Sequence, residues 1–367
     1  MNSRERVMRA WKLKEGMPDR IPIQFDLCRS LQDHFAQELG VESRYTDNIF
    51  EDVTYRISGN EVRLAMGSDL VIVGASEAAA FTKVIEADGT WYNEYHQKLK
   101  QGPLYVETVE FPLAEAETRE DIDAFEWPDP HDPSRYIDAE YYVKRYKDEY
   151  LVIGDIEVTI LSLAQQLVGM EKLLVDMAME EEYVEYLFEK CAEFQTEIGK
   201  ELIRRGVDAI WVGDDFGSQT SLLFSPDMFR KMLKPYYVQM IKELKKERED
   251  ILCILHCDGA VKLLLHDIKE IGFDVFNPVQ PGVPGHSPKE LKDEFEDLLC
   301  FWGAIDQQYL LPNGTDEEVE ADIKEKCEVL GRNGGYVISP AHIIQVDVTP
   351  ERVKFFIEKA KQYGRYE

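Results

Sequence analysis

The chain has 367 residues, of which 44% are apolar, and its 42 Lys and Arg against 71 Asp and Glu give a formal net charge of −29. A protein this acidic repels nucleic-acid backbones and anionic lipid headgroups, which argues against nucleic-acid and membrane-surface partners. The length permits one large domain or two ordinary ones, and the apolar content is sufficient for a sizeable core.

The cysteines and the N-terminal segment indicate the compartment. Six cysteines lack the regular spacing of a disulfide framework, which is typical of a reduced protein. The first residues, MNSRERVMRAWKLKEG, are charged and unlike a signal peptide. No run approaches the roughly 18 apolar residues of a membrane span. We therefore expect a soluble, cytoplasmic protein.

Short apolar, β-branched runs recur along the chain, each followed by a helical stretch. Continuous apolar runs indicate strands buried on both faces, and their alternation with helices indicates a parallel sheet. Eight such units predict a single α/β domain over residues 1–367, a (β/α)8 TIM barrel, with an open doubly wound sheet as the alternative. The predicted strands are residues 20–27, 69–75, 150–157, 209–216, 251–259, 275–281, 299–306 and 336–343.

One interval, residues 77–149, is too long for a simple helical connection. It contains a strong hairpin turn at Asp88-Gly89 and a Pro/Asp-rich loop, EWPDPHDPSR. We expect a β-hairpin and helix excursion between the second and third barrel strands. This excursion would decorate the barrel mouth and would not form a separate domain.

Polar residues stand at the carboxyl ends of the predicted strands, where a TIM barrel carries its active site. Seven of the eight apolar runs end in acids, amides or histidines, which is not expected by chance, so together they indicate an enzyme pocket. The residues concerned are Asp26, Asp155, Glu157, Asp214, Asp215, His256, Cys257, Asp258, Asn277, Gln280, Asp306 and His342.

The most specific local motif is His256-Cys257-Asp258-Gly259. Alternate residues of a strand share a face, so His256 and Asp258 should point into the mouth and Cys257 toward the helices. Imidazole and carboxylate can bind one Zn²⁺ at about 2.0–2.2 Å, and His342 could supply a third ligand. Two alternatives are a hydrogen-bonded pair that orients substrate without metal, and ligation by Cys257 if the loop reorients.

Two adjacent acids, Asp214 and Asp215, form a second candidate site. Both cannot be buried without partners, so one could act as a general acid or base while the other caps a helix. Glu157 is a further candidate for proton transfer or metal binding. We expect substrate contacts from the polar residues Asn277, Gln280, Gln219, Asp306 and Asp26.

Several segments resemble the uroporphyrinogen decarboxylase superfamily, which includes methanol and methylamine coenzyme M methyltransferases and is related to cobalamin-independent methionine synthase. The similarity runs through nearly the whole chain. It is carried by MNSRERVMRAWKLKEGMPDRIPI, WVGDDFGSQTSLLFSPDMFRKMLKPYY, LHCDGAVKLLLHDIKEIGFDVFNPVQP, WGAIDQQYLLPNGTDEEV and GGYVISPAHIIQVDVTPERVKFF.

The methyltransferase branch is similar at a His-x-Cys-Gly and a Ser-Pro-x-Cys motif that hold zinc in that family. The matching residues here are His256, Asp258 and His342, so both family cysteines are replaced. A His/Asp/His set is harder and suits Zn²⁺ or another divalent ion. The decarboxylase branch matches less well, because its arginine-rich segment is reduced to Arg29, although it also has a histidine at the position of His342.

The resemblance implies a metal-dependent methyltransferase that moves a methyl group between a corrinoid protein and a small molecule. The metal would be Zn²⁺, and the corrinoid would be carried by the partner protein. Asp214, Glu157 and Asp215 would act in catalysis, and a homodimer is compatible with the sequence. The alternatives are uroporphyrinogen decarboxylation and a non-catalytic subunit of a methyltransferase complex.

Overall fold

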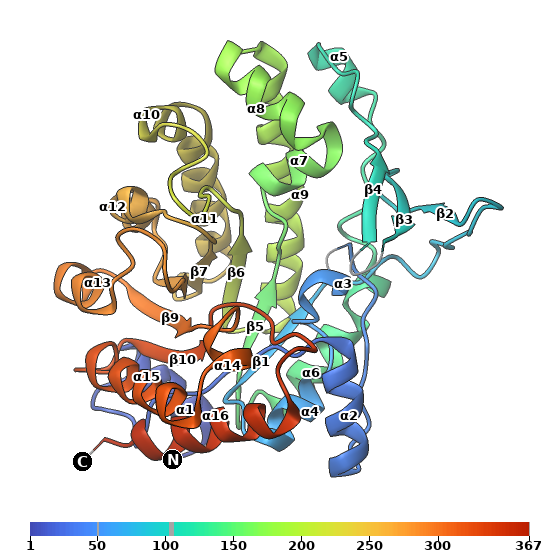
Figure 1. The fold of residues 1–367 in the computed structure, drawn as a ribbon. Coiled ribbons are helices and arrows are strands. Elements are labelled where there is room, and N and C mark those ends of the chain that lie inside the picture. Colours follow the sequence, from blue (N-terminus) through green and yellow to red (C-terminus); the bar gives the residue numbers. More distant parts are fainter. Residues whose placement is uncertain (50, 103–105, 367) are drawn as a thin grey trace.

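A curled parallel sheet with helices around it forms the centre of the computed structural model, which describes residues 1–49, 51–102 and 106–366 (Figure 1). Every neighbouring pair in this sheet is parallel. Within the described residues the sheet has seven strands in the order β1 (Leu70–Gly74), β5 (Leu151–Asp155), β6 (Ala209–Gly213), β7 (Leu252–His256), β8 (Val275–Val279), β9 (Cys300–Ile305) and β10 (Tyr336–Pro340).

The segment predicted as the first strand, residues 20–27, differs from the prediction. It makes only isolated parallel bridges to the last strand region, between Ile23 and Ile338 and between Leu27 and Ile344. On its other side, the Asp69 N–H donates to the Ile23 carbonyl at 2.8 Å. Pro22 has no N–H to donate, which interrupts a regular ladder. The segment therefore lies between β1 and β10 as extended backbone and not as a continuous strand.

Helices follow most of the strands and lie outside the sheet (Figure 1). Side-chain caps begin several of them, including a Thr315/Glu318 capping box and Thr349 at the last helix. The helical segments are α1 (Ser3–Ala10), α2 (Arg29–Leu39), α3 (Glu51–Thr54), α4 (Asn60–Met66), α5 (Arg119–Asp123), η1 (Pro133–Tyr136), α6 (Ile137–Tyr146), α7 (Leu161–Val168), α8 (Met170–Met179), α9 (Glu182–Arg205), α10 (Pro226–Met228), η2 (Phe229–Leu233), α11 (Lys234–Glu247), η3 (Lys262–Leu264), α12 (Leu265–Ile271), α13 (Pro288–Phe295), α14 (Leu310–Asn313), α15 (Asp316–Val329) and α16 (Pro350–Tyr363).

The two faces of the strands belong to two different apolar cores. Leu70 and Ile72 of β1 pack in the cluster inside the curled sheet, whereas Val71 and Val73 pack in the larger cluster beneath the helices. The strands are buried on both faces, as their continuous apolar runs predict. Successive side chains point alternately to the two faces, and this alternation continues just past the strand ends. It therefore determines which polar residues point into the mouth.

The long interval between β1 and β5 forms a second, antiparallel sheet of β2 (Thr90–Tyr92), β3 (Lys98–Gln101) and β4 (Val106–Glu110). An antiparallel bridge between Ile85 and Trp91 flanks the predicted turn at Asp88-Gly89, and Gly89 has a φ of +82°. Glycine adopts this left-handed conformation without steric cost. The hairpin is therefore present, and in Figure 1 this sheet lies to one side of the parallel sheet.

All six cysteine side chains are buried and free. Among the helices of the described ranges, none combines the length and the apolar character that crossing a bilayer requires.

Candidate metal centre

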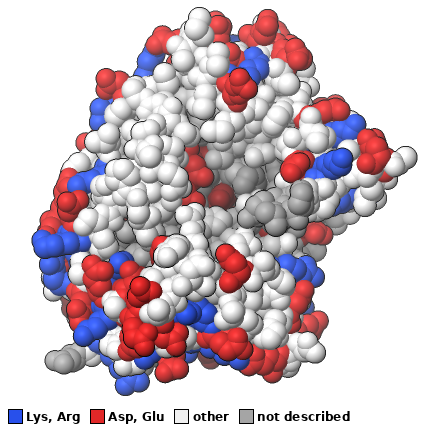
Figure 2. All heavy atoms as spheres, in the orientation of Figure 1, with Lys and Arg blue, Asp and Glu red and all other residues white. Residues whose placement is uncertain are grey.

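A hollow opens near the centre of the face shown in Figure 2, and acidic side chains lie at its bottom. A crevice is lined by Trp211, His256, Asn277 and His342, which lie on or directly after strands β6, β7, β8 and β10. Asp26, from the extended segment beside β10, also lines it. The carboxyl ends of the parallel strands thus converge here, as expected for a sheet of this kind.

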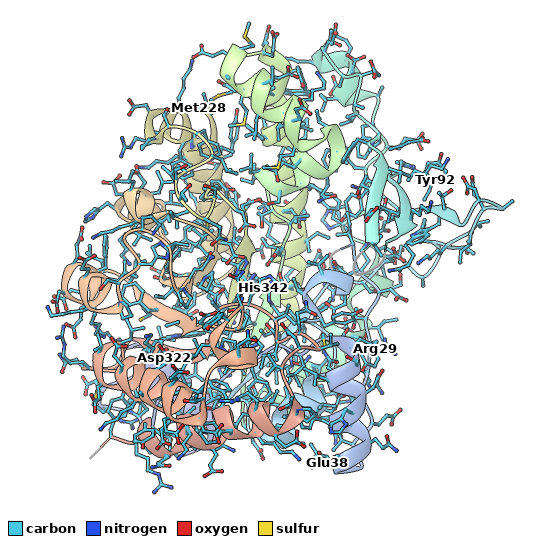
Figure 3. All side chains as sticks on the ribbon, viewed as in Figure 1. Arg29, Glu38, Tyr92, Met228, Asp322 and His342 are labelled. Carbon is cyan, nitrogen blue, oxygen red and sulfur yellow. The ribbon has the colours of Figure 1, made fainter. Side chains whose placement is uncertain are left out.

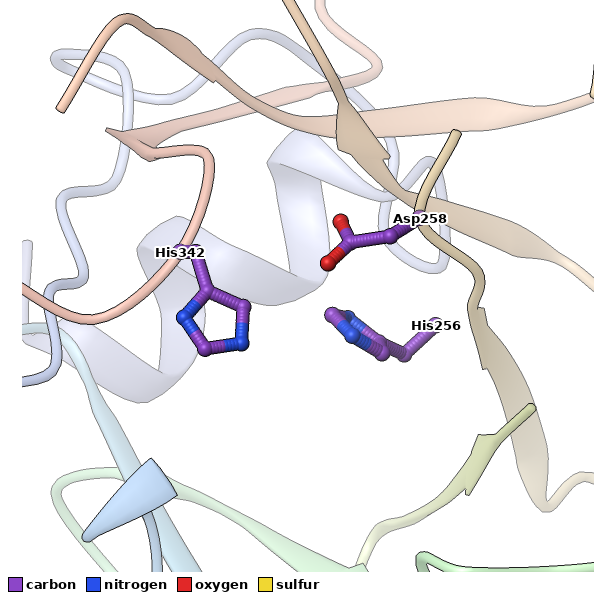
Figure 4. Close-up of side chains that lie close together, drawn as sticks. All are labelled: His256, Asp258 and His342. Carbon is purple, nitrogen blue, oxygen red and sulfur yellow. The ribbon is translucent and has the colours of Figure 1, made fainter. Parts of the chain in front are cut away.

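Three potential metal ligands lie together in this hollow. His256 ends β7, Asp258 follows two residues later, and His342 comes two residues after β10. One donor atom from each lies within 4.8 Å of the others. Figure 4 shows their side chains approaching one another from these two strand ends, and Figure 3 places His342 near the middle of the molecule. His256 is buried, and the other two are half-buried.

The His256 ring is held in one orientation by its neighbours. Its Nδ1 lies 2.6 Å from the amide oxygen of Asn277. An amide oxygen can only accept, so Nδ1 carries a proton and Nε2 keeps its lone pair in the neutral ring. Trp211 stacks on the imidazole at a centroid distance of 5.4 Å and an angle of 23°. Such second partners commonly orient a metal-binding histidine.

Protonation in the cluster follows from burial and from neighbouring charge. Burial, with help from His256 and Arg56, lowers the pKa of His342 to about 4, so its ring is neutral near pH 7. Burial also disfavours a charged His256, but Glu157, Asp258 and Asp215 outweigh it and raise its pKa. His256 therefore accepts a proton more readily than an ordinary histidine, and His342 less readily.

A buried arginine that the sequence analysis missed organises the acids beside the cluster. The Arg56 side chain is 4% exposed and forms ion pairs with Asp155 at 3.3 Å, Asp26 at 3.7 Å and Glu157. It also lies 4.2 Å above the centroid of Trp211, whose Nε1 donates to Glu157 at 2.9 Å. Burial raises the pKa of Glu157, but Arg56, His256 and Trp211 lower it more, so the pKa is below its ordinary value.

Asp26 is held by a second buried arginine, Arg63, and accepts a hydrogen bond from the Gln24 amide at 2.8 Å. Asp26 therefore lines the crevice as half of an ion pair, and its contact with a substrate stays a prediction. A signal for both arginines was present in YRISGNEVR, where a turn-forming Ser-Gly-Asn separates two arginines directly before β1. The arginine that the sequence analysis did name, Arg29, is half-exposed and stacks on Tyr45.

The adjacent acids Asp214 and Asp215 lie on opposite sides of the sheet. Asp214 is 2% exposed and accepts hydrogen bonds from the backbone N–H groups of Ile160 and Ser162 at 2.8 and 2.6 Å, and from the Tyr237 hydroxyl. It thus caps the start of α7, which precedes it in the chain. Asp215 is exposed and accepts the Asp258 N–H at 2.7 Å. The structure brings Asp215 to the cluster and does not bring Asp214 there.

The other residues predicted for the site also differ in whether they lie near the cluster. Gln280 accepts the Gly259 N–H at 2.7 Å and donates to Gln219 at 3.0 Å, which places both amides along the loop after Asp258. Asp306 accepts hydrogen bonds from two backbone N–H groups, at 2.8 and 3.0 Å, just before α14. Its carboxylate is thus engaged at the start of that helix and not at the cluster. The Cys257 thiol faces the outer core and accepts the Phe216 N–H at 3.2 Å.

The cluster suits a divalent metal by its chemistry. Two imidazoles and one carboxylate form a known catalytic zinc set with an open position, and the same set binds Fe²⁺ in other proteins. Bonds of about 2.1 Å place tetrahedral ligands roughly 3.4 Å apart, so donors within 4.8 Å must approach each other by up to about 1.4 Å. Rotation about side-chain bonds is sufficient for this, and the residues present fit the ion.

Comparisons with known proteins identify the family of the chain. The sequence model of the uroporphyrinogen decarboxylase (URO-D) family matches residues 104–363. Uroporphyrinogen decarboxylase of Schizosaccharomyces pombe is 32% identical over 148 residues, 38% of this chain and 39% of that protein. The corresponding enzyme of Chlorobium phaeovibrioides is 26% identical over 252 residues, 66% of this chain and 69% of that protein.

Two methyltransferases are also similar. Methylcobamide:CoM methyltransferase MtbA of Methanosarcina mazei is 26% identical over 221 residues, 60% of each chain. A solved structure described as a methyltransferase from Methanosarcina mazei has a TM-score of 0.70 at 15% identity, with 99% of both chains covered. That likeness concerns the fold. The aligned regions span 39% of the length of the S. pombe relative and 60% of MtbA.

Proposed function

Because the chain belongs to the uroporphyrinogen decarboxylase family, we propose that it is a metal-dependent methyltransferase that moves a methyl group between a corrinoid protein and a small molecule. The observation that carries this proposal is the convergence of His256, Asp258 and His342 at the mouth. The similarity to MtbA, whose name specifies methyl transfer from a methylcobamide, supports it.

His256, Asp258 and His342 would hold the ion, with Zn²⁺ as the proposed metal. When bound, the ion would supply a Lewis acid that polarises or helps to deprotonate the small substrate. Asn277 would fix the His256 ring, because it occupies Nδ1 and leaves Nε2 free. The three ligands come from the ends of β7 and β10, which the core holds rigidly.

The other chain residues would position substrate and protons. Asp215 is exposed beside Asp258 and is the proposed proton acceptor. Glu157 is paired with Arg56, so we assign it to orienting that side chain. Gln280 and Gln219 would supply hydrogen bonds along the adjacent loop. Asp214 and Asp306 are assigned to helix starts, since backbone N–H groups already occupy their carboxylates.

We further propose that residues 20–27 complete an eight-unit barrel and that the three-stranded sheet decorates its mouth. A corrinoid protein would dock over this mouth. Three large apolar side chains that follow β7, β9 and β10 support such docking, because Leu263, Tyr309 and Val346 are 70%, 69% and 70% exposed. A homodimer and a cytoplasmic location remain predictions.

Metal analysis and a methyl-transfer assay together test the proposal. The protein is purified without chelator and its metal is quantified, along with His256→Ala, His342→Ala and the control His266→Ala, whose side chain is 62% exposed. We expect about one divalent ion per chain in the unaltered protein and the control, and a loss of about 10-fold or more in metal affinity in the other two. Methyl transfer from methylcobalamin to a thiol should follow the metal content. Metal content that is negligible in the unaltered protein, or unchanged in His256→Ala, would refute the metal centre.

Porphyrinogen decarboxylation is the second candidate, because several similar proteins carry that name. It would need cationic groups to grip substrate carboxylates. The two buried arginines beside the mouth, Arg56 and Arg63, are already paired with acids of the chain. Incubation with uroporphyrinogen separates the candidates, because stepwise loss of substrate carboxylates would favour decarboxylation.

A further inference from the structure

A second cavity, of about 320 Å³, lies between the three-stranded antiparallel sheet and the segment that leads into α3. Small-molecule pockets begin at about 300 Å³, so this volume suits a small ligand and is far too large for one bare ion. Its lining includes the acids Asp47, Glu51 and Glu77 and the aromatic residues Phe81 and Trp91.

Glu51 is the first sign that this cavity takes a cation. Its side chain is 6% exposed, and its Oε2 accepts the Ile57 N–H at 3.3 Å. Its Oε1 is buried and has no hydrogen-bond partner among the described residues. Burial raises the pKa of Glu51 to about 8, and Asp155 adds to this, while Ser58 and Arg63 oppose it. A buried carboxylate without its full set of partners is costly unless a ligand supplies them.

Glu77 is a second acid on the same cavity. It is half-buried, and no ion pair to a described residue is recorded for its carboxylate. Burial raises its pKa to about 7; Glu94 and Asp47 add to this, and Lys83 and Arg135 act against it. Arg135 is fully engaged, since it donates to both oxygens of Glu94 at 2.6 and 2.7 Å.

The aromatic wall already binds a cation. The Lys83 ammonium lies 3.9 Å from the centroid of Trp91, which is a cation–π contact. Lys83 belongs to an exposed segment and can move aside, whereas Trp91 is only 7% exposed and stays in the wall. The cavity thus combines an aromatic face with three acids and only one lysine.

We propose that this cavity binds a small organic ammonium ion, with its charge between Glu51 and Glu77 and its alkyl groups against Trp91. A narrow crevice shares Asn48 and Glu77 with the cavity and is also lined by Asp155, so the ammonium site lies beside the acids that hold Arg56. The inference goes beyond the proposed methyl transfer and does not require a metal.

Calorimetric titration with choline and trimethylammonium chloride tests the charge requirement. The control ligand is 3,3-dimethylbutan-1-ol, the neutral isostere of choline. We expect saturable binding of both cations and at least about 10-fold weaker binding of the alcohol. Binding should tighten from about pH 6 to about pH 9, because a bound cation favours the ionised forms of Glu51 and Glu77.

Matched variants locate the site. Glu51→Gln and Glu77→Gln should each weaken choline binding by about 10-fold, and Trp91→Leu should weaken it as well. Glu107→Gln, an exposed acid on β4 that does not line the cavity, should leave binding unchanged. His256→Ala should also bind choline normally, so this proposal and the metal centre can fail independently.

Three results would overturn the proposal. One is the absence of saturable binding by either cation, and another is equal binding of choline and its neutral isostere. The third is full displacement of choline by potassium at equal concentration, which would indicate an inorganic cation site. Circular dichroism confirms that each variant is folded, and removing an unpaired buried acid should stabilise the fold, so unfolding would not explain a loss of binding.

Discussion

The mouth of the parallel sheet and the cavity beside the antiparallel sheet are both lined by carboxylates, but they are neutralised differently. At the mouth, Arg56 pairs with Asp155 and Glu157 inside the protein. In the cavity, Glu51 and Glu77 lack such a partner among the described residues. Asp155 and Glu157 therefore have their balancing charge within the fold, whereas Glu51 and Glu77 leave that charge to a ligand.

The largest expected effect comes from removing the charge that balances the mouth. Arg56→Met keeps an unbranched apolar stem in place of the arginine stem but removes the guanidinium, which leaves Asp155 and Glu157 without their shared partner. Breaking a buried ion pair from one side costs about 3–5 kcal/mol of unfolding free energy, because the remaining charge is uncompensated. Chemical denaturation measures this loss.

Arg29→Met is the matched control, because Arg29 is half-exposed and its ion pair with Asp33 is on the surface. Its loss should cost less than about 1 kcal/mol. If Arg56→Met cost equally little, the acids at the mouth would be solvated, and the contrast between the two regions would disappear.

Glu51→Gln tests the opposite case, in which a charge without a partner is removed. The unfolded chain loses this proton near pH 4.5, whereas the folded protein keeps it until about pH 8. Between these values the folded state binds more protons, so unmodified protein loses stability as pH rises, and Glu51→Gln does not. The advantage of the variant should be absent below about pH 4 and should then grow by up to about 1.4 kcal/mol for each pH unit until about pH 8.

Thermal unfolding across this pH range measures the difference, with Glu107→Gln as the control on β4. A stability difference that is constant with pH would show that Glu51 ionises normally, and it would remove the main support for an ammonium ligand.

The position of the mouth could be predicted from strand periodicity, because that periodicity is a local property. The alternation of side chains along β7 predicts His256 and Asp258 on one face and Cys257 on the other, and in the structure His256 and Asp258 lie in the cluster while Cys257 lies in the outer core. It could not decide between Asp214 and Asp215, since both follow β6 and the choice depends on the N–H groups of α7, which lie about 50 residues away in the chain.

The arginines and the cavity could not be predicted in this way. Arg56 precedes α4 and Arg63 lies within it, and their burial depends on how that short helix packs against β1 and the segment around Asp26. The cavity needs a loop before β1, the excursion and Gln166 of α7 to meet. Neither the burial of the two arginines nor the cavity can be predicted from sequence periodicity, because both depend on contacts between residues far apart in sequence.

Asp214→Asn and Asp215→Asn separate the two neighbouring acids. Asp214 accepts three hydrogen bonds, and an amide cannot accept all of them because its NH₂ group would face a donor. The cost should be about 1–2 kcal/mol. Asp215→Asn should change stability by less than about 0.5 kcal/mol, since its amide oxygen can still accept the Asp258 N–H. Equal losses in denaturation experiments would contradict the assignment of Asp214 to the helix cap.

A smaller effect than at Glu51 is expected at Glu77, which shares the cavity with Glu51 but is less buried and lies near Lys83 and Arg135. Its pKa of about 7 is raised above that of the unfolded chain, so it too lowers stability as pH rises. The gain in unfolding free energy from Glu77→Gln should be about 1 kcal/mol and stop growing near pH 7, one unit below the plateau for Glu51→Gln.

Saturating choline should reduce the gains of both variants, because a bound ammonium ion supplies the charge that the two acids lack. If choline left both pH profiles unchanged, the unpaired acids would be a property of the fold alone and not of a binding site.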